Sequence, residues 1–430
     1  RAIDLDTIPS DVINTLEVSK TLLPAQDADS ITGTVNITTR SAFDKPGTRL
    51  SASVGGSHND FGGNDVRASA FVSSTFADNQ WGVTLRGSYS RTARRGDNIE
   101  SAWGVLDTPE GGEVLGLVES LFKDYDTRRE RIALTGGLEF QPDEASRFYV
   151  RGSYSRFEDD EYRNQLLIIW EDGTLQPGAT DRSATFTNGR IHKQFRHRVQ
   201  RNVIATLTAG GENDLGGIKL DYNIAWTKSD QNYPSRSELL FRSSARPTIS
   251  YDFTGSPELP AISLFQTGEH LDVSRYGFRE NAYRNNITAN DEYSGAFNIS
   301  VPLDMGGNPL ELKMGGRYRD RSVTADEERP RDRRAGSAPS GTLADYLSSR
   351  PSTNYDYDLG LKFNPGPTKA HLLALRDAAA SERRIPQSIT ADYEADEKIL
   401  AGYAMLRGEF GATDIILGLR VENTRFDRSE

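Results

Sequence analysis

The fold of this chain is constrained above all by a two-residue alternation of apolar and polar side chains that recurs along its length. Between Trp81 and Arg91, every second residue is aromatic, aliphatic or glycine, and the residues between them are small, hydroxylated or charged. Successive side chains of a β-strand point to opposite faces, so this period predicts strands with one apolar and one polar face. We expect eleven such strands, over residues 49–56, 65–76, 81–91, 132–140, 148–155, 199–209, 218–227, 293–301, 310–319, 400–410 and 415–422.

The connections between these strands alternate in length. Short connections cover residues 77–80, 141–146, 210–217, 303–308 and 411–413, and long ones cover about 92–127, 157–184, 228–290 and 320–395. Only the first connection, 57–64, is short where a long one would fit. Tight turns at one end and long loops at the other predict a transmembrane antiparallel β-barrel with long extracellular loops. In the first long loop, Glu113–Tyr125 has helix-like apolar spacing and predicts a short helix over the barrel mouth.

The two faces of the predicted strands differ in chemistry. One face carries charges at mid-strand, which need water and therefore predict a wet interior: Arg86, Arg151, Lys219, Asp221, Arg317, Arg407 and Arg420. The apolar face must then meet lipid. Aromatic side chains near the strand ends predict two interfacial belts, one of Phe76, Trp81, Phe140 and Phe148 and one of Tyr89, Tyr154, Trp226 and Tyr318.

Composition excludes several other classes of protein. The 430 residues carry a formal net charge of −11, which argues against a nucleic-acid partner, because phosphate contacts need a basic face. The chain has no cysteine, so disulfides, thiolate metal sites and cysteine nucleophiles are excluded. Its five histidines are scattered, and the acidic run Glu158–Glu161 lacks the pattern of a calcium loop. We therefore expect no enzyme, no cofactor and no metal.

The first forty residues differ from the rest and resemble a known family. Leu16-Glu17-Val18, a small-residue turn around Asp27–Gly33 and the segment GTVNITTR lead directly into the first predicted barrel strand. This arrangement resembles the end of the plug domain of TonB-dependent outer-membrane receptors. The motif positions are Leu16, Glu17, Val18, Gly33, Val35, Asn36, Thr38 and Arg40. Thr32 and Thr21 depart from the family pattern, since glycine is usual at both positions.

The resemblance implies a domain division. Residues 1–46 would be the C-terminal end of an N-terminal plug domain, and residues 47–430 the first part of a barrel of the 22-stranded type, with about eleven strands covered. The chain would then be an internal piece of a longer receptor in the outer membrane of a Gram-negative bacterium. A half-barrel leaves two open edges, which lipid does not tolerate, so the intact wall must continue past Glu430.

The function implied by the resemblance is TonB-dependent active import of a scarce nutrient, with no catalysis. The implied partners are the TonB energy-coupling complex, reached through the preceding part of the plug, outer-membrane lipid, and a surface lipoprotein. The expected ligand is an oligosaccharide or a similar polymer-derived nutrient, and a ferric siderophore is the alternative. Loop aromatics beside charged residues are candidate substrate-binding residues: Trp103, Tyr125, Trp170, Tyr233, Tyr251 and Phe253.

Three rival interpretations stay open at this point. A passive porin-like channel would share the barrel but lack the plug segment. A soluble β-rich binding or adhesion protein would share the strands. A surface hydrolase built as a β-solenoid would need a regular repeat and a carboxylate pair on stacked turns.

Overall fold

The computed structural model describes residues 15–28, 33–38, 40–333, 335–352, 356–376 and 388–429. Its main feature is one antiparallel sheet in which eleven long strands lie side by side in chain order. These strands are β3 (Arg49–Asn59), β4 (Gly63–Phe76), β5 (Trp81–Asp107), β6 (Glu113–Asp143), β7 (Ser146–Ile169), β10 (Arg190–Asp214), β11 (Lys219–Ser243), β14 (Tyr276–Met305), β15 (Asn308–Glu328), β19 (Tyr393–Phe410) and β20 (Thr413–Ser429). The two-residue strand β16 (Arg331–Asp332) pairs with β14 beside them.

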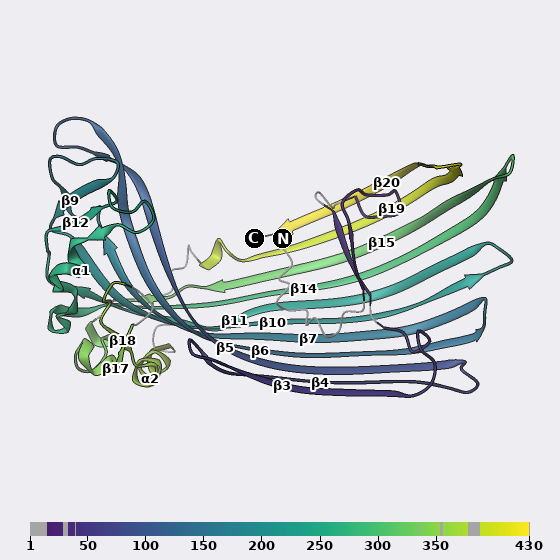
Figure 1. Cartoon of the computed structure of the whole chain (residues 1–430), viewed down its shortest axis with the longest axis horizontal. Coiled ribbons are helices and arrows are strands. Elements are labelled where there is room, and N and C mark those ends of the chain that lie inside the picture. Colours follow the sequence, from purple (N-terminus) through teal and green to yellow (C-terminus); the bar gives the residue numbers. More distant parts are fainter. Residues whose placement is uncertain are drawn as a thin grey trace.

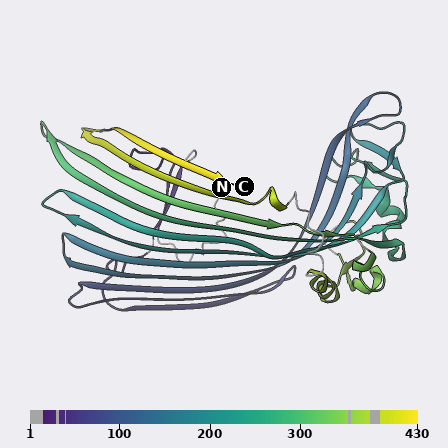
Figure 2. The same cartoon turned by 180° about the vertical axis from the view of Figure 1, so that it is seen from behind.

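The all-β, antiparallel architecture predicted from the sequence is confirmed. Ten of the eleven alternating segments lie within one of the long strands, and the segment 218–227 begins one residue before β11. Figures 1 and 2 show the sheet as a curved wall with short turns at one end, which we call the turn end. At one of these turns, Gly306 and Gly307 have φ angles of 66° and 85°. Two residues with positive φ match the twist of the flanking strands, and this conformation favours glycine.

At the opposite end the strands are longer than the sequence predicts. The connection expected over 92–127 shrinks to residues 108–112, because β5 and β6 pair as far as Asp107 and Glu113. The helix expected over Glu113–Tyr125 is wrong, since these residues belong to β6. A register shift beside Trp103 places Leu117 and Phe122 in the same buried core, so a bulged strand reproduces the apolar spacing of a helix.

The other expected loops are also shortened by strand. The segment expected over 157–184 is strand as far as Ile169, the one over 228–290 is strand to Ser243 and again from Tyr276, and the one over 320–395 is strand to Glu328. The acidic run Glu158–Glu161 therefore lies within β7 and not at a loop base. Its charges are hydrogen-bonded across the sheet, which is why a polar sequence is extended there.

The remaining connections fold into a compact lobe at this end of the wall, visible beside α1 and α2 in Figure 1. We call it the lobe. Its elements are β8 (Thr174–Leu175), β9 (Ser183–Thr187), β12 (Ile249–Asp252), β13 (Ala261–Ile262), α1 (Ser263–Thr267), η3 (Glu269–Leu271), η4 (Val273–Arg275), η5 (Ala335–Ser337), η6 (Leu343–Tyr346), β17 (Leu347–Pro351), β18 (Leu361–Phe363) and α2 (Pro365–Arg376). Within the described ranges, no helix has the length and apolar character needed to cross a membrane.

The two faces of the wall stay separate along the whole length of β7 and β10, because these strands pair without a register shift. On one face, Val150 and Leu207 are exposed near the turn end, whereas Leu166 and Phe195 are buried under the lobe. We call this the outer face. The opposite, concave face carries charged side chains such as Arg151 and is called the inner face.

Apolar exposure is greatest on the outer face of the turn-end half. Leu207, Ile224 and Leu419 are 50%, 68% and 70% exposed, respectively. At its edge, the four aromatics of the first predicted belt form one continuous row. Consecutive ring centroids lie 6.4, 4.5 and 6.3 Å apart from Phe76 through Trp81 and Phe140 to Phe148.

If the turn-end half meets lipid, a charge placed there must be costly. We expect Leu207→Arg to destabilise the full-length protein in lipid vesicles by about 2–4 kcal/mol, the cost of an arginine near the bilayer centre. Equilibrium urea unfolding measures this loss. Thr208→Arg is the matched control, since Thr208 lies on the inner face and an arginine there reaches water. Equal losses for the two variants would contradict the assignment of the outer face to lipid.

Candidate functional site on the inner face

A two-stranded hairpin crosses the inner face of the wall. It consists of β1 (Thr15–Ser19) and β2 (Thr34–Thr38), which pair antiparallel with Leu16 opposite Ile37 and Val18 opposite Val35. Figures 1 and 2 show it running across the wall strands. The two motif segments taken from the sequence are thus direct partners. Residues 1–14, 29–32 and 39 of the predicted plug end lie outside the described residues.

One end of the hairpin region is fixed to the wall by a shared carboxylate. Asp27 lies 2.9 Å from an Arg317 Nη and accepts a hydrogen bond of 3.1 Å from Arg420, while Arg319 stands at 3.8 Å. Arg420 is 9% exposed and also donates to Glu422 at 2.6 Å. Arg319 and Arg420 are 14% and 9% exposed, so their interactions with Asp27 are stronger than those of exposed pairs, whereas Arg317 is 40% exposed. We call these residues the Asp27 cluster.

A second attachment follows β2, where the chain enters the wall. The buried carboxylate of Glu139 accepts hydrogen bonds from Arg147 at 2.7 Å and from Arg151 at 2.6 Å. It also accepts from the Ser41 hydroxyl at 2.5 Å and from the Ala42 backbone N–H at 3.2 Å. With four donors on one carboxylate, this corner is saturated, and the hairpin cannot shift there without losing charge-assisted hydrogen bonds.

Between the hairpin and the wall lies a cavity of about 490 Å³. The hairpin side contributes Asn36, Thr38 and Arg40. Above Phe71, Arg40 and Arg86 place their guanidinium groups 5.9 and 5.3 Å from the ring centroid. The wall side is rich in hydroxyl and guanidinium groups, from Thr84, Arg86, Thr135, Tyr149, Arg151, Ser153, Tyr154, Ser155, Thr206 and Thr208. Such a surface can hydrogen-bond a polar solute from several directions.

The aromatics chosen from the sequence divide into two groups. Trp170 and Tyr251 are buried in the lobe core with ring centroids 5.3 Å apart, and their polar atoms bond to Ser120 and to the Leu117 backbone. Phe253 packs against Tyr251 at 5.8 Å and against Trp103 at 5.4 Å, and Trp103 is exposed. These four therefore form one cluster that holds the lobe together.

The other two aromatics lie apart from this cluster, on the inner face. Tyr125 stands opposite Arg163 in the β6–β7 ladder, and Tyr233 stands opposite Asn286 in the β11–β14 ladder. Tyr125 has the parity of the inner-face residues of β6, and Tyr233 has that of the inner-face residues of β11 between the turn end and the register shift that follows Tyr233. A substrate-binding role for any of the six residues stays a prediction.

Sequence reasoning missed a belt of paired charges on the inner face near the lobe. Arg196 donates to Glu161 at 2.6 Å, and Arg198 donates to Glu161 at 2.8 Å and to Asp159 at 3.0 Å. Arg163 donates to Gln194 at 2.8 Å in the same belt. The signal was present, since these charges recur at every second residue of β7 and β10. Long charged stretches were assigned to loops instead.

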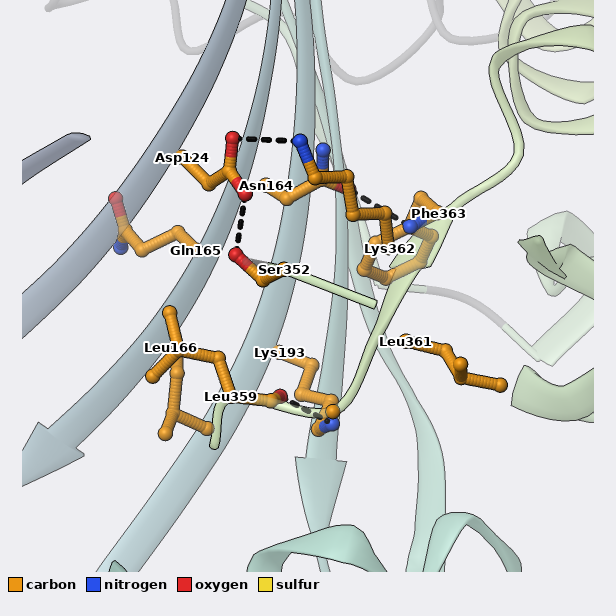
Figure 3. A pocket seen from close by; sticks show the side chains of 11 residues that line it. Asp124, Asn164, Gln165, Leu166, Lys193, Ser352, Leu359, Leu361, Lys362 and Phe363 are labelled. Carbon is orange, nitrogen blue, oxygen red and sulfur yellow. Dashed lines mark hydrogen bonds and ion pairs between the residues drawn. The ribbon is translucent and has the colours of Figure 1, made fainter. Parts of the chain in front are cut away.

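A second, smaller pocket lies where the lobe meets the wall (Figure 3). The buried Asp124 accepts a hydrogen bond from Lys362 Nζ at 2.7 Å and another from the Ser352 hydroxyl. Asn164 accepts one from the Phe363 backbone at 2.7 Å. The space is about 20 Å³, room for one water molecule, so this is a structural joint and not a ligand site.

Among the described residues, no group of three or more histidines or carboxylates is placed to hold a metal ion.

Comparison with known proteins gives only distant structural likenesses. No family model and no curated protein matches the chain. The ferric preacinetobactin receptor BauA of Acinetobacter baumannii is similar at 10% identity and a TM-score of 0.26, over 92% of this chain and 61% of the receptor. The siderophore receptor PiuA of the same species is similar at 8% identity and a TM-score of 0.19, over 97% and 79% of the two chains. The ferric citrate transporter FecA is similar at 10% identity and a TM-score of 0.17, over 96% and 75%.

From the contacts of the Asp27 cluster we infer that the Asp27 carboxylate holds the hairpin region on the wall. We expect Asp27→Asn in the full-length protein to raise the frequency of open-channel events in planar bilayers, because three arginines lose their shared counter-charge. Asp44→Asn is the control, since Asp44 lies in the next connection, between β2 and β3, where it accepts a hydrogen bond from the nearby Ser41 backbone. Unchanged conductance in Asp27→Asn would contradict a closing role for the cluster.

Lys193 lines the pocket of Figure 3. Because its amine is buried, we expect the stability of the lobe to depend on pH. Burial lowers the pKa of Lys193 to about 8, and its Nζ donates to the Leu359 carbonyl at 3.2 Å. Between pH 8 and the ordinary lysine value of about 10.5, the unfolded state binds more protons, so rising pH favours the folded lobe.

Unfolding followed by the fluorescence of the buried Trp170 measures this effect. Relative to Lys193→Met, the wild type should gain up to roughly 3 kcal/mol across that window. The Lys193→Met variant lacks the titrating amine. The difference in unfolding free energy between the two proteins therefore leaves out the contribution of all other titrating residues. A difference between the two proteins that does not change with pH would contradict the burial of a titrating amine.

Proposed function

We propose that this chain is part of an outer-membrane active importer of the TonB-dependent type. The observation that carries the proposal is the β1–β2 hairpin, which lies across the inner face and is attached to the wall at two places. In a passive channel, a segment hydrogen-bonded across the lumen would obstruct diffusion. A hairpin held by ion clusters instead suits a gate that is closed at rest and opened by applied work.

The outer membrane is the proposed location because of the outer face. Its exposed leucines, isoleucines and aromatics would be unfavourable in water and favourable in lipid, whereas the inner face needs water. Within the described residues, β3 and β20 are the edges of the sheet. In a bilayer these edges must pair with further strands, so the proposal includes a closed barrel of the 22-stranded type.

The proposed domain division follows the sequence prediction. Residues 1–46 would close the plug and residues 47–430 would form wall and lobe. Work would reach the hairpin from an inner-membrane energy-coupling complex through the chain that precedes it. Displacing the hairpin would break the Asp27 cluster and the Glu139 corner together, because both lie on the same short stretch of chain.

The proposed substrate is an oligosaccharide or a similar polymer-derived nutrient, with a surface lipoprotein as a further partner. The hydroxyl, amide and guanidinium groups around the 490 Å³ cavity support a hydroxyl-rich solute. A ferric siderophore is the second candidate, since the cavity also contains Phe71 and Tyr149, against which a flat chelate can pack.

Uptake by whole cells tests the proposal. Cells that carry the full-length protein are given labelled oligosaccharides or labelled ferric siderophores, with and without a protonophore. We expect uptake of one of these classes to fall to the level of cells lacking the protein when the inner-membrane gradient is collapsed. A labelled small sugar that enters through general porins is the control. Uptake that is indifferent to the gradient would favour the passive channel and contradict active import.

A further inference from the structure

A third cavity, of about 160 Å³, lies on the inner face nearer the lobe. It is formed where β11, β14 and the segment after β15 meet. Four arginines line it together with one carboxylate: Arg236, Arg284, Arg329, Arg331 and Glu238. These side chains come from three separate parts of the chain, so only the folded wall brings them together.

The carboxylates around this cavity are already shared between cations. Glu327 is paired with both Arg284 and Arg329. Glu280 lies 3.4 Å from Arg331 and 2.5 Å from Arg333. Hydrogen bonds from the Arg329 and Arg284 guanidinium groups outweigh the opposing effect of burial and lower the pKa of Glu327 to about 2, so it is ionised at neutral pH.

Glu238 is also engaged by two groups. It accepts a hydrogen bond of 3.3 Å from Arg236 and one of 3.2 Å from the Gln194 amide. Among the described residues of this site, five guanidinium groups therefore face three carboxylates. Two positive charges remain in excess, inside a chain whose formal net charge is −11.

The excess charge is partly shielded from water. Burial lowers the pKa of Arg236, and the like charges of Arg196 and Arg284 lower it further, against an opposing effect of Glu238. An arginine so placed stays charged, because its ordinary pKa is far above neutrality. The repulsion is relieved by an anion that enters the cavity, and partial desolvation strengthens that attraction.

We propose that this cavity binds an oxyanion group of the transported substrate: a carboxylate, a phosphate or a sulfate. The inference rests on the proposed import function and narrows the substrate to acidic solutes. Guanidinium forks match the planar oxygens of such groups and bind them through two parallel hydrogen bonds. A volume of about 160 Å³ is below the ~300–1,000 Å³ of whole-ligand pockets, so the cavity takes a head group.

The test uses the double variant Arg236→Gln with Arg331→Gln. Each substitution leaves its glutamate a remaining partner, Gln194 for Glu238 and Arg333 for Glu280, so no carboxylate is stranded. Arg407→Gln is the matched control, because Arg407 pairs with Asp414 beside the turn between β19 and β20, far along the wall.

Calorimetric titration of the full-length protein in detergent uses a galacturonate trimer, tricarballylate and inorganic pyrophosphate, with maltotriose as the uncharged comparison. We expect saturable binding of at least one anion, weakened about tenfold or more in the double variant and unchanged in Arg407→Gln. A preference for the galacturonate trimer identifies an acidic oligosaccharide, and a preference for tricarballylate identifies a carboxylate chelate. No binding of any of the three anions, or equal binding by wild type and double variant, overturns the inference.

The failure of this inference and the failure of the proposed function are distinguishable. If uptake depends on the gradient and is identical in wild type and double variant, active import is supported and the oxyanion site is contradicted. If anion binding depends on Arg236 and Arg331 but uptake by cells does not depend on the gradient, the oxyanion site is supported and active import is contradicted.

Discussion

Unbroken antiparallel pairing is the constraint on which the rest of this structure depends. Because β7 and β10 keep one register from the turn end to the lobe, a residue that points inward at one end fixes the direction of every other residue on its strand. Near the turns this parity separates an apolar face from a polar one, and the same two faces continue to the lobe. On β11 and β14, register shifts between Tyr233 and Arg236 change which residues point inward, so the arginine cavity is placed by the bulge as well as by the pairing.

The outer face meets two different surroundings without changing sides. Near the turns its apolar residues are exposed, and nearer the lobe the same face is covered by a core that includes Trp170, Tyr251 and Phe363. The inner face is mainly polar, with apolar residues such as Phe71 and Ile204 among the polar ones, and many of its charges are bonded across strands. This division explains how one sheet can carry an exposed apolar band, a packed lobe and a polar concave face at once.

The sequence predicts the half of the wall nearest the turns well, because there one face is apolar and the alternation is visible. It does not predict the upper strands, where both faces carry polar side chains: Asp160 bonds to His197 on the outer side, and Glu161 bonds to Arg196 on the inner side. The false helix has a different cause, since the bulge beside Trp103 replaces a period of two with an irregular spacing.

The candidate sites show the same limit. The hairpin motif was recognisable because its residues are contiguous, whereas the cavity of Arg236, Arg284 and Arg331 is assembled from positions far apart in the chain. No local pattern marks such a site. The aromatics chosen by residue type were divided by the fold, with Tyr125 and Tyr233 on the wall and the others in or beside the lobe core.

The Asp27 cluster also has a consequence for the open wall. While the hairpin is seated, one of its carboxylates neutralises charge contributed by Arg317 and Arg319 of β15 and by Arg420 of β20. A hairpin that leaves carries this negative charge away and uncovers the guanidinium groups. In an importer of the proposed type, the lumen would therefore be more electropositive after the hairpin has moved than while it is seated.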